Sequence, residues 1–266
     1  TVTGVQTCAL PIWATRKAPK IMQPSQISIW SVAGLVWGNR SFMTLVVLYG
    51  VMTLAIALIT AGLPFAALYL ILDSGDTALS SMAAGLGILS LMFAAFVLGS
   101  ILSQAIWVWV SGRFGKTPAL VGGLLCYIVL LGVIYLSLPS FDVTLVAGLF
   151  LIAGMTNGAY QQIPWAMYPD LMDETRASSG EAIEGAFSAI WLFGQKVANA
   201  LAPSLLAVIL AVYGWKETDQ GRTEQTPEAI GALHYAITLV PAGILCLAVI
   251  GLIFVYKAPV HRRAGY

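Results

Sequence analysis

Charged residues are scarce in this chain. Lys, Arg, Asp and Glu together make up 9% of the 266 residues, whereas hydrophobic residues make up 59%. A soluble domain carries roughly 25% charged residues, so the composition excludes an ordinary water-soluble fold. The formal net charge of +1 gives no electrostatic basis for binding nucleic acid. We therefore expect a protein that crosses the lipid bilayer several times and has no nucleic-acid partner.

Cysteine and histidine are also scarce. Cys8, Cys126 and Cys246 show no CxxC spacing, which predicts neither a disulfide framework nor a metal site. The two histidines, His234 and His261, have no partner at ligand spacing. The sequence contains no HxxxH motif, no paired intramembrane carboxylates and no Ser–His arrangement. We predict that the protein is not an enzyme and that it holds no metal ion and no covalently bound cofactor.

The first twelve residues look foreign to the rest of the sequence. The stretch VTGVQTCALPI, residues 2–12, resembles the in-frame translation of a sequencing adapter. A genuine leader is the alternative, but a signal peptide has a longer apolar core behind basic residues. We expect residues 1–12 to be non-native, the true N-terminus to lie upstream, and the residues before Ile21 to be structureless.

Six apolar stretches are long enough to cross a bilayer, which takes about 20 helical residues. They are Phe42–Leu72, Gly85–Val110, Ala119–Leu138, Val143–Tyr168, Ala182–Tyr213 and Leu233–Tyr256. The predicted fold is an all-α membrane protein without strands, its six transmembrane helices lying within residues 42–257 and a cytoplasmic tail covering residues 258–266.

A shorter apolar stripe precedes the first span, within residues 13–41. Its members recur at helical spacing: Ile27, Trp30, Ala33, Val36 and Trp37. About three turns of helix cannot span a bilayer, and tryptophan favours the membrane surface. We expect a cytoplasmic loop with an interfacial helix; a soluble linker helix is the alternative.

Basic residues give the orientation, because Lys and Arg accumulate on the cytoplasmic side. If the first span starts in the cytoplasm, ten basic residues lie inside: Arg16, Lys17, Lys20, Arg40, Arg113, Lys116, Arg176, Lys257, Arg262 and Arg263. Only Lys216 and Arg222 lie outside. We predict a multi-pass protein of the cell (inner) membrane with both ends in the cytoplasm.

Polar side chains recur along one face of the fourth and fifth spans. Asn157 and Gln161 are four residues apart and share a helix face with Trp165, and the fifth span repeats this spacing in Trp191, Gln195 and Asn199. Amides facing lipid are costly, so these faces either line a cavity or bind another helix. We interpret them as the wall of a substrate cavity.

Lys196 lies at the edge of the same face, near the middle of the fifth span. A lysine at that depth costs about 2.5–3.5 kcal/mol on the insertion scale, and both membrane surfaces are roughly 20 Å away. It must therefore meet water, a carboxylate or a substrate, although snorkelling remains an alternative. No carboxylate of this chain is predicted at membrane depth, so we expect the counter-charge to come from helices outside it.

The stretch YPDLMDETRASSGEAIEG, residues 168–185, concentrates charge between two apolar spans. Its charged residues, including Asp170, Asp173, Arg176 and Glu184, are predicted to form a cytoplasmic loop. On the same side, the loop SGRFGKTP carries Arg113 and Lys116. A merely solvated loop is the alternative to a functional one.

These features resemble the C-terminal half of a major facilitator transporter. PWAMYPDLMDE and FGQKVANALAP are similar to the glycoside–pentoside–hexuronide:cation symporter family, over residues 25–256. The resemblance implies that this chain supplies helices 7–12 and lacks the N-terminal six-helix half.

The same resemblance implies roles for individual residues. Lys196 would lie between the cation and sugar sites, the stretch around Gln161 would line the substrate cavity, and Asp170, Arg176 and Glu184 would form an inner gate. The full predicted cytoplasmic gate is Asp170, Asp173, Arg176, Glu184, Arg113 and Lys116. The coupling cation, sodium or proton, would bind mainly in the N-terminal half.

The predicted function is therefore cation-coupled symport of a sugar or glycoside by alternating access. Two alternatives stay open: a carrier of the same superfamily for a lipid or drug, and a six-helix membrane scaffold.

Overall fold

A computed structural model describes residues 29–179, 183–216 and 223–256. The predictions for residues 1–12, for the residues before Ile21 and for the tail at 258–266 lie outside these ranges. The helices are α2 (Ile29–Gly38), α3 (Arg40–Tyr69), α4 (Ser80–Leu86), α5 (Ile88–Phe114), α6 (Lys116–Ser137), α7 (Val143–Ser179), α8 (Glu184–Val212), α9 (Pro227–Ile237) and α10 (Leu239–Phe254).

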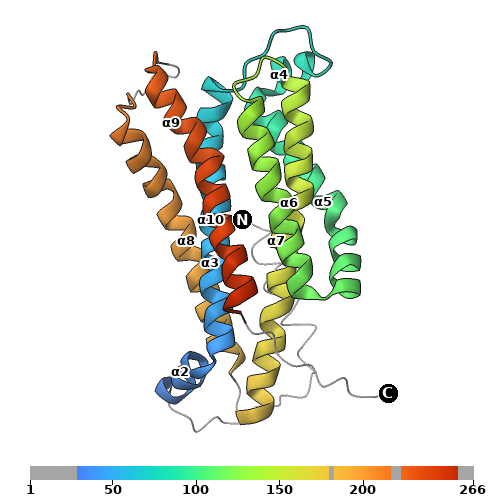
Figure 1. The fold of residues 1–266 in the computed structure, drawn as a ribbon, viewed down its shortest axis with the longest axis vertical. Helices are drawn as coiled ribbons and strands as arrows, with labels where there is room; N and C mark the ends of the chain where they lie inside the picture. The colour runs from blue at the N-terminus through green and yellow to red at the C-terminus, as the bar shows by residue number, and fades with distance from the viewer. Residues whose placement is uncertain (1–28, 180–182, 217–222, 257–266) are drawn as a thin grey trace, which may run out of the picture.

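The predicted six-span helical bundle is confirmed. Six helical segments of the described chain are long and apolar enough to cross a membrane, with α9 and α10 together counting as the last. They run side by side along the long axis of the molecule (Figure 1). No strand occurs among the described residues; a single isolated bridge joins Ile71 to Ser140 near the end of the bundle where α4 lies.

The structure corrects two predicted boundaries. The charged stretch expected to be a loop is largely helical, because α7 continues through Pro169 to Ser179. The last span, expected to be one helix, breaks at Thr238, whose φ of −123° and ψ of −73° are not helical. Pro241 accounts for this break, since it has no N–H for the carbonyl of Ile237 and its ring crowds that carbonyl.

Glycines set the distance between α5 and α7. A Cβ added at Gly154 would collide with the carbonyl oxygen of Phe96, and one at Gly158 would collide with the hydroxyl of Ser103. Gly154 and Gly158 are four residues apart, the spacing of small residues that lets two membrane helices approach closely. Trp107 fills the neighbouring space and donates its indole N–H to the carbonyl of Met155 at 2.7 Å.

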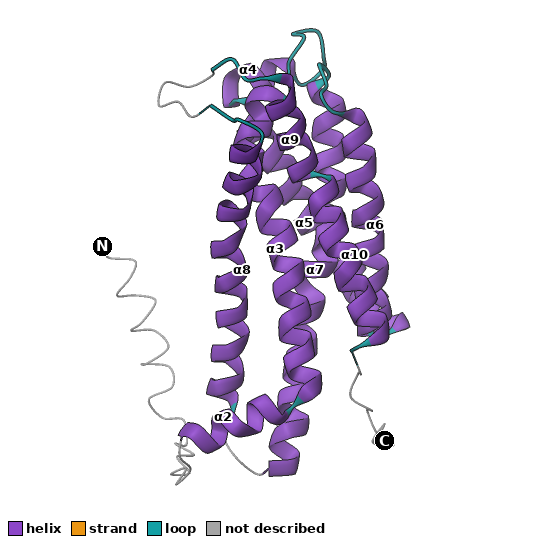
Figure 2. Cartoon of the chain, turned by 60° about the vertical axis from the view of Figure 1, so that its left-hand side comes forward, coloured by secondary structure: helices purple, strands orange, loops and turns teal. Residues whose placement is uncertain are grey.

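The remaining helices form the other side of the bundle. α3 packs mainly against α8 and α10, and α10 also contacts α6. In the view of Figure 2, α8 stands at the edge with most of its length beside α3. Between α5 and α6 the chain turns on one residue, Gly115, whose φ of 92° disfavours a side chain.

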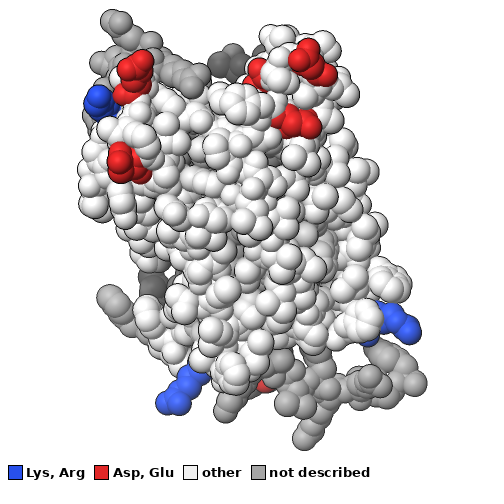
Figure 3. Space-filling model, turned by 45° about the horizontal axis from the view of Figure 1, so that its top comes forward, with Lys and Arg blue, Asp and Glu red and all other residues white. Residues whose placement is uncertain are grey.

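Charge is confined to the two ends on the face shown in Figure 3, with a broad uncharged belt between them. Arg40, Arg113, Lys116 and Arg176 lie where α3 and α6 begin and where α5 and α7 end, which is one end of the bundle. We call this the basic end. The opposite end, which carries α4, is the outer end of the predicted topology.

α2 lies across the basic end beside α3 and α8 (Figures 1 and 2). Val36 points into the protein and is fully buried, whereas Trp37 is 66% exposed. Asn39 follows α2 and caps α3, its side-chain oxygen accepting from the N–H of Phe42 at 2.9 Å. This geometry agrees with the predicted short helix in residues 13–41; its position in the membrane surface stays a prediction.

Candidate functional site

A polar cavity of about 370 Å³ opens between α3, α7 and α8. Six of the ten lining residues can form hydrogen bonds and four are apolar. Its residues are Thr53, Ile56, Ala57, Thr60, Ala61, Tyr160, Gln161, Gln195, Asn199 and Pro203. Such a lining, with a few polar groups set among apolar ones, is typical of small-molecule sites.

The structure brings three of the seven predicted substrate residues together on this cavity: Gln161, Gln195 and Asn199. Asn157, predicted to belong to the cavity wall, does not line this cavity. It is only 1% exposed, and neither polar atom of its amide has a hydrogen-bond partner among the described residues. Asn157 lies one turn before Gln161, and the helix turns its side chain into the bundle.

Trp165 and Trp191 lie beside the cavity in an aromatic layer with Tyr49 and Tyr168. The Trp191 ring stacks on Tyr49 with centroids 4.3 Å apart, and on Tyr168 at 5.0 Å. Trp165 meets Trp191 edge-on at 6.0 Å. Trp191 is 1% exposed, so it supports the cavity rather than facing it.

The aromatic layer borders the cavity on the side of the basic end. Tyr49 precedes Thr53 by four residues, and Trp191 precedes Gln195 by four. On the antiparallel α7, Trp165 follows Gln161 by four. On each helix the aromatic residue is therefore one turn, about 5.4 Å, nearer the basic end than the polar residue.

Lys196 follows Gln195 but does not line the cavity. It is exposed near the middle of α8, and within the described residues it makes no hydrogen bond or ion pair. Its neighbour on the helix surface, Phe193, is 69% exposed. The lysine thus belongs to an uncovered face of α8 at membrane depth.

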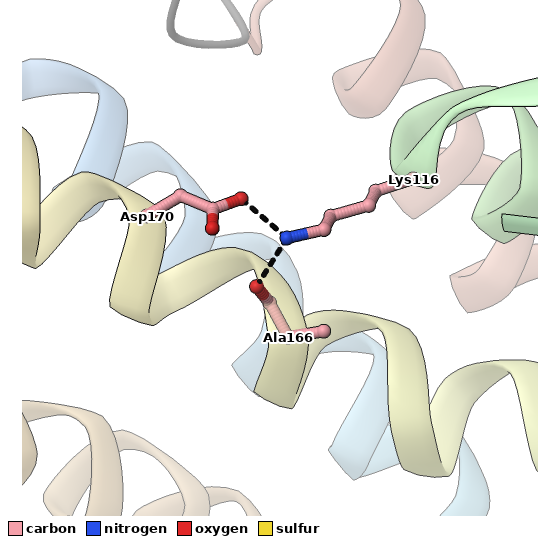
Figure 4. A network of polar contacts seen from close by, with 3 residues as sticks. All are labelled: Lys116, Ala166 and Asp170. Carbon is pink, nitrogen blue, oxygen red and sulfur yellow. Dashed lines mark hydrogen bonds and ion pairs between the residues drawn. The ribbon is translucent and has the colours of Figure 1, made fainter. Parts of the chain in front are cut away.

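At the basic end, two ion pairs join consecutive helices. Lys116 Nζ lies 2.6 Å from Asp170 Oδ2 and donates to the carbonyl of Ala166 at 2.8 Å (Figure 4). Arg176 Nη1 lies 2.6 Å from Glu184 Oε1. The first pair holds the start of α6 on α7, and the second joins the end of α7 to the start of α8.

The other two predicted gate residues stay apart from these pairs. Arg113 and Asp173 are both exposed, and neither has an ion-pair or hydrogen-bond partner in the part of the chain that the structure describes. An exposed pair is worth only about 0–1 kcal/mol, so the contact between Arg176 and Glu184 can break at little cost, whereas the pair of Lys116 with Asp170 is half-buried.

One further contact and one pKa shift at the basic end were not predicted from the sequence. Asn39 Nδ2 donates to Thr175 Oγ1 at 2.7 Å, linking the start of α3 to α7. Burial, together with the negative charges of Asp170 and Glu174, raises the pKa of Tyr256 to about 12. Tyr256 therefore stays neutral at physiological pH.

The described residues bring no three His, Cys, Asp or Glu side chains together in a way that could hold a metal ion. The expectation that the cation-binding carboxylates lie outside this chain stays a prediction.

Sequence reasoning missed the contribution of α3. Tyr49, Thr53 and Thr60 all point toward α7 and α8, where Thr53 Oγ1 lies 2.8 Å from Tyr160 OH. Their spacing of four and seven residues places them on one helix face. That stripe in the first span was the available signal.

Comparison with known proteins agrees with this architecture. The sequence matches the family described as MFS/sugar transport protein over residues 5–259. The chain is 26% identical to the mouse sphingosine-1-phosphate transporter MFSD2B over 62% of its length, covering 32% of that protein. It is 30% identical to a glucuronide carrier protein homolog of Escherichia coli over 57% of its length, covering 32% of that protein.

A third relative is the human sodium-dependent lysophosphatidylcholine symporter 1, at 26% identity over 64% of the chain and 30% of that protein. The chain thus spans about a third of the length of each of these relatives. The family match covers nearly all of the described bundle. This chain belongs to the MFS/sugar transport protein family.

Proposed function

We propose that the chain is the C-terminal half of a cation-coupled symporter that moves a sugar or glycoside by alternating access. The observation that carries this proposal is the cavity between α3, α7 and α8, in which amides and hydroxyls alternate with apolar side chains. A glycoside has the matching chemistry, with hydroxyls on the sugar and a less polar aglycone.

The coupling step is assigned to Lys196. An exposed ammonium in mid-helix, one residue from the cavity amide of Gln195, needs a partner in the membrane. In the proposed transporter the missing N-terminal half supplies that partner from the carboxylates that bind sodium or a proton. Competition between ammonium and cation for the same carboxylates would link ion occupancy to conformation.

The inner gate is assigned to the basic end. Alternating access requires contacts that form in one state and break in the other. The pair Arg176–Glu184 meets this requirement because it is exposed and therefore weak, and the half-buried pair Lys116–Asp170 lies beside it at the same end. In this proposal both chain ends face the cytoplasm, as the bias in basic residues predicts.

A lipid carrier is the second candidate. Ile56, Ala57, Ala61 and Pro203 give the cavity an apolar component, and the relatives named above include carriers of sphingosine-1-phosphate and lysophosphatidylcholine. Lys196 beside this cavity could pair with a phosphate in that case.

Uptake by the full-length transporter in proteoliposomes tests both candidates. We expect sodium- or proton-driven accumulation of a methyl glycoside from a panel of glucoside, galactoside and glucuronide. Accumulation of lysophosphatidylcholine without any glycoside would replace the first candidate by the second. Uptake that depends on neither the sodium gradient nor the proton gradient would refute symport.

A further inference from the structure

The hydrogen bonds of the cavity wall determine which chemical groups it leaves free. Asn199 Nδ2 donates to the backbone carbonyl of Gln195 at 3.0 Å. A carbonyl can only accept, so the amide nitrogen must face it. This bond uses one of the two N–H groups of the amide, and the amide oxygen keeps both lone pairs for a ligand.

Gln195 has one of its two N–H donors occupied in a similar way. Its Nε2 donates to the hydroxyl oxygen of Tyr49 at 3.2 Å. The indole N–H of Trp165, which can only donate, reaches the same oxygen at 3.1 Å. Tyr49 thus accepts two N–H groups, one from α7 and one from α8, and Gln195 Oε1 remains free at the cavity.

Thr60, across the cavity on α3, also uses its donor within the protein. Its hydroxyl proton goes to the carbonyl of Ile56 at 3.0 Å, which leaves the oxygen lone pairs. Thr60, Gln195 and Asn199 each use one donor inside the protein. Their three side-chain oxygens keep about six lone pairs, whereas one N–H of each amide is left. Acceptors therefore outnumber donors on these residues, and their complement is a ligand that donates.

We infer that this wall recognises its ligand through the ligand's hydroxyl protons, with Gln195 Oε1 and Asn199 Oδ1 as acceptors and Tyr49 as the positioning residue. Tyr49 itself does not line the cavity; its hydroxyl holds the Gln195 amide in the accepting orientation. The inference rests on the proposed glycoside transport and states which groups of the substrate the site recognises. A phosphodiester with a quaternary ammonium, which offers almost no donors, fits the wall poorly.

Fluorinated substrates test this inference in the full-length transporter. The methyl glycoside that is transported is compared with analogues in which one hydroxyl at a time is replaced by fluorine, which cannot donate. At one or more positions we expect kcat/KM to fall by up to about tenfold, the worth of one hydrogen bond. Equal transport of all the fluorinated analogues would overturn the inference while leaving glycoside transport intact. Absence of any glycoside transport would instead refute the proposed function.

Tyr49→Phe separates positioning from a structural role, because it keeps the ring stacked on Trp191 and removes only the hydroxyl. In this variant we expect the ratio of kcat/KM for the methyl glycoside to kcat/KM for the fluorinated analogue to fall toward one. Tyr69→Phe is the matched control: it removes the hydroxyl bonded to the carbonyl of Thr223, away from the cavity, and should keep discrimination.

If Tyr49→Phe lowered kcat/KM by the same factor for the glycoside and for every fluorinated analogue, Tyr49 would have only a structural role. If that variant does not fold, Gln195→Met removes the acceptor itself and should abolish the same discrimination. Retained discrimination in Gln195→Met would contradict the inference.

Discussion

α7 and α8 are nearly equal in hydropathy but opposite in burial. Their most apolar stretches have mean hydropathies of 1.5 and 1.6, yet 61% of that stretch is buried in α7 and 22% in α8. Small residues make the difference on the α7 side, where Gly154 and Gly158 admit α5. On α8, Phe193 and Val212 are 69% and 76% exposed. Hydropathy identifies a span, and side-chain size decides whether another helix covers it.

The close packing of α5 and α6 against α7 makes a compact side, although the outward face of α5 is as exposed as α8. The outward face of α8, which carries Lys196, makes an open side. A compact side can move as a rigid body, because its contacts are made by backbone and small side chains. An open face with a lysine at membrane depth is incomplete on its own. Under the proposed function, the open side is where the other half of the transporter docks.

The largest effect is expected from breaking the compact side. Gly154→Val places a branched side chain against the carbonyl of Phe96, and a backbone contact cannot yield by a rotamer change. Overpacking costs about 1–3 kcal/mol, and we expect the upper end, seen as a lower unfolding temperature in detergent. Gly148→Val is the control, since it lies on the same helix with nothing within 4 Å of the added Cβ. Equal melting of the two variants would show that the α5–α7 contact is looser than described.

On the open side, Lys196→Ala should weaken the coupling between cation and substrate transport without unfolding the protein. In the full-length transporter we expect cation-driven accumulation to fall by about 5- to 150-fold, the range of ordinary coupling energies, while downhill movement of substrate falls less. The paired measurements are uptake with and without a cation gradient. Lys216→Ala, in the outer loop after α8, is the control and should leave both rates unchanged. Unchanged concentrative uptake in Lys196→Ala would make the lysine structural.

Only part of this architecture could be predicted from the sequence. The six spans, the glycine contact and the cavity amides Gln161, Gln195 and Asn199 followed from periodicity and composition. Such signals are local, because a helix face is fixed by spacing alone. The burial of Asn157 did not follow, since whether a helix face meets lipid, cavity or protein depends on which partner helix lies against it.

Contacts between residues far apart in the sequence could not be predicted either. Tyr49 and Gln195 are 146 positions apart, and nothing in either span predicts that the amide donates to the hydroxyl. The helical extension of α7 through Pro169 also escaped, because charge and proline both favour a loop on local grounds and tertiary packing overrides them.

A smaller effect is expected at the basic end of the compact side. Lys116→Met removes the ion pair with Asp170 and the bond to the carbonyl of Ala166. Because the pair lies at the surface and is only half-buried, solvent still screens it, and we expect about 1 kcal/mol of lost stability, measured by thermal unfolding. Arg113→Met, which removes a cation without a partner among the described residues, should change less. A loss well above this in Lys116→Met would show that the pair is a structural lock and not an exchangeable gate contact.

The smallest effect concerns the outer end of the compact side, where Asp73 organises the loop before α4. Its carboxylate accepts from the hydroxyl of Ser80 at 2.6 Å and from the N–H of Gly75 at 3.0 Å. These bonds lower the pKa of Asp73 below its ordinary value. A carboxyl group whose pKa is lowered by folding stabilises the folded loop above its ordinary pKa of about 4, and the contribution is lost as the pH falls through the lowered value.

Hydrogen exchange in the loop at residues 72–79, corrected for its intrinsic pH dependence, measures this contribution. We expect faster exchange at pH 3 than at pH 7, and Asp73→Asn should show the faster exchange already at pH 7. The increase should be modest, because backbone bonds from Leu72 to Ser140 at 2.8 Å and from Ser140 to Leu70 at 3.0 Å remain. Asp76→Asn, which removes a nearby carboxylate without a described partner, should behave like the parent chain. If both variants exchange alike, the backbone bridge alone holds the loop and Asp73 contributes nothing to the rigidity of the compact side.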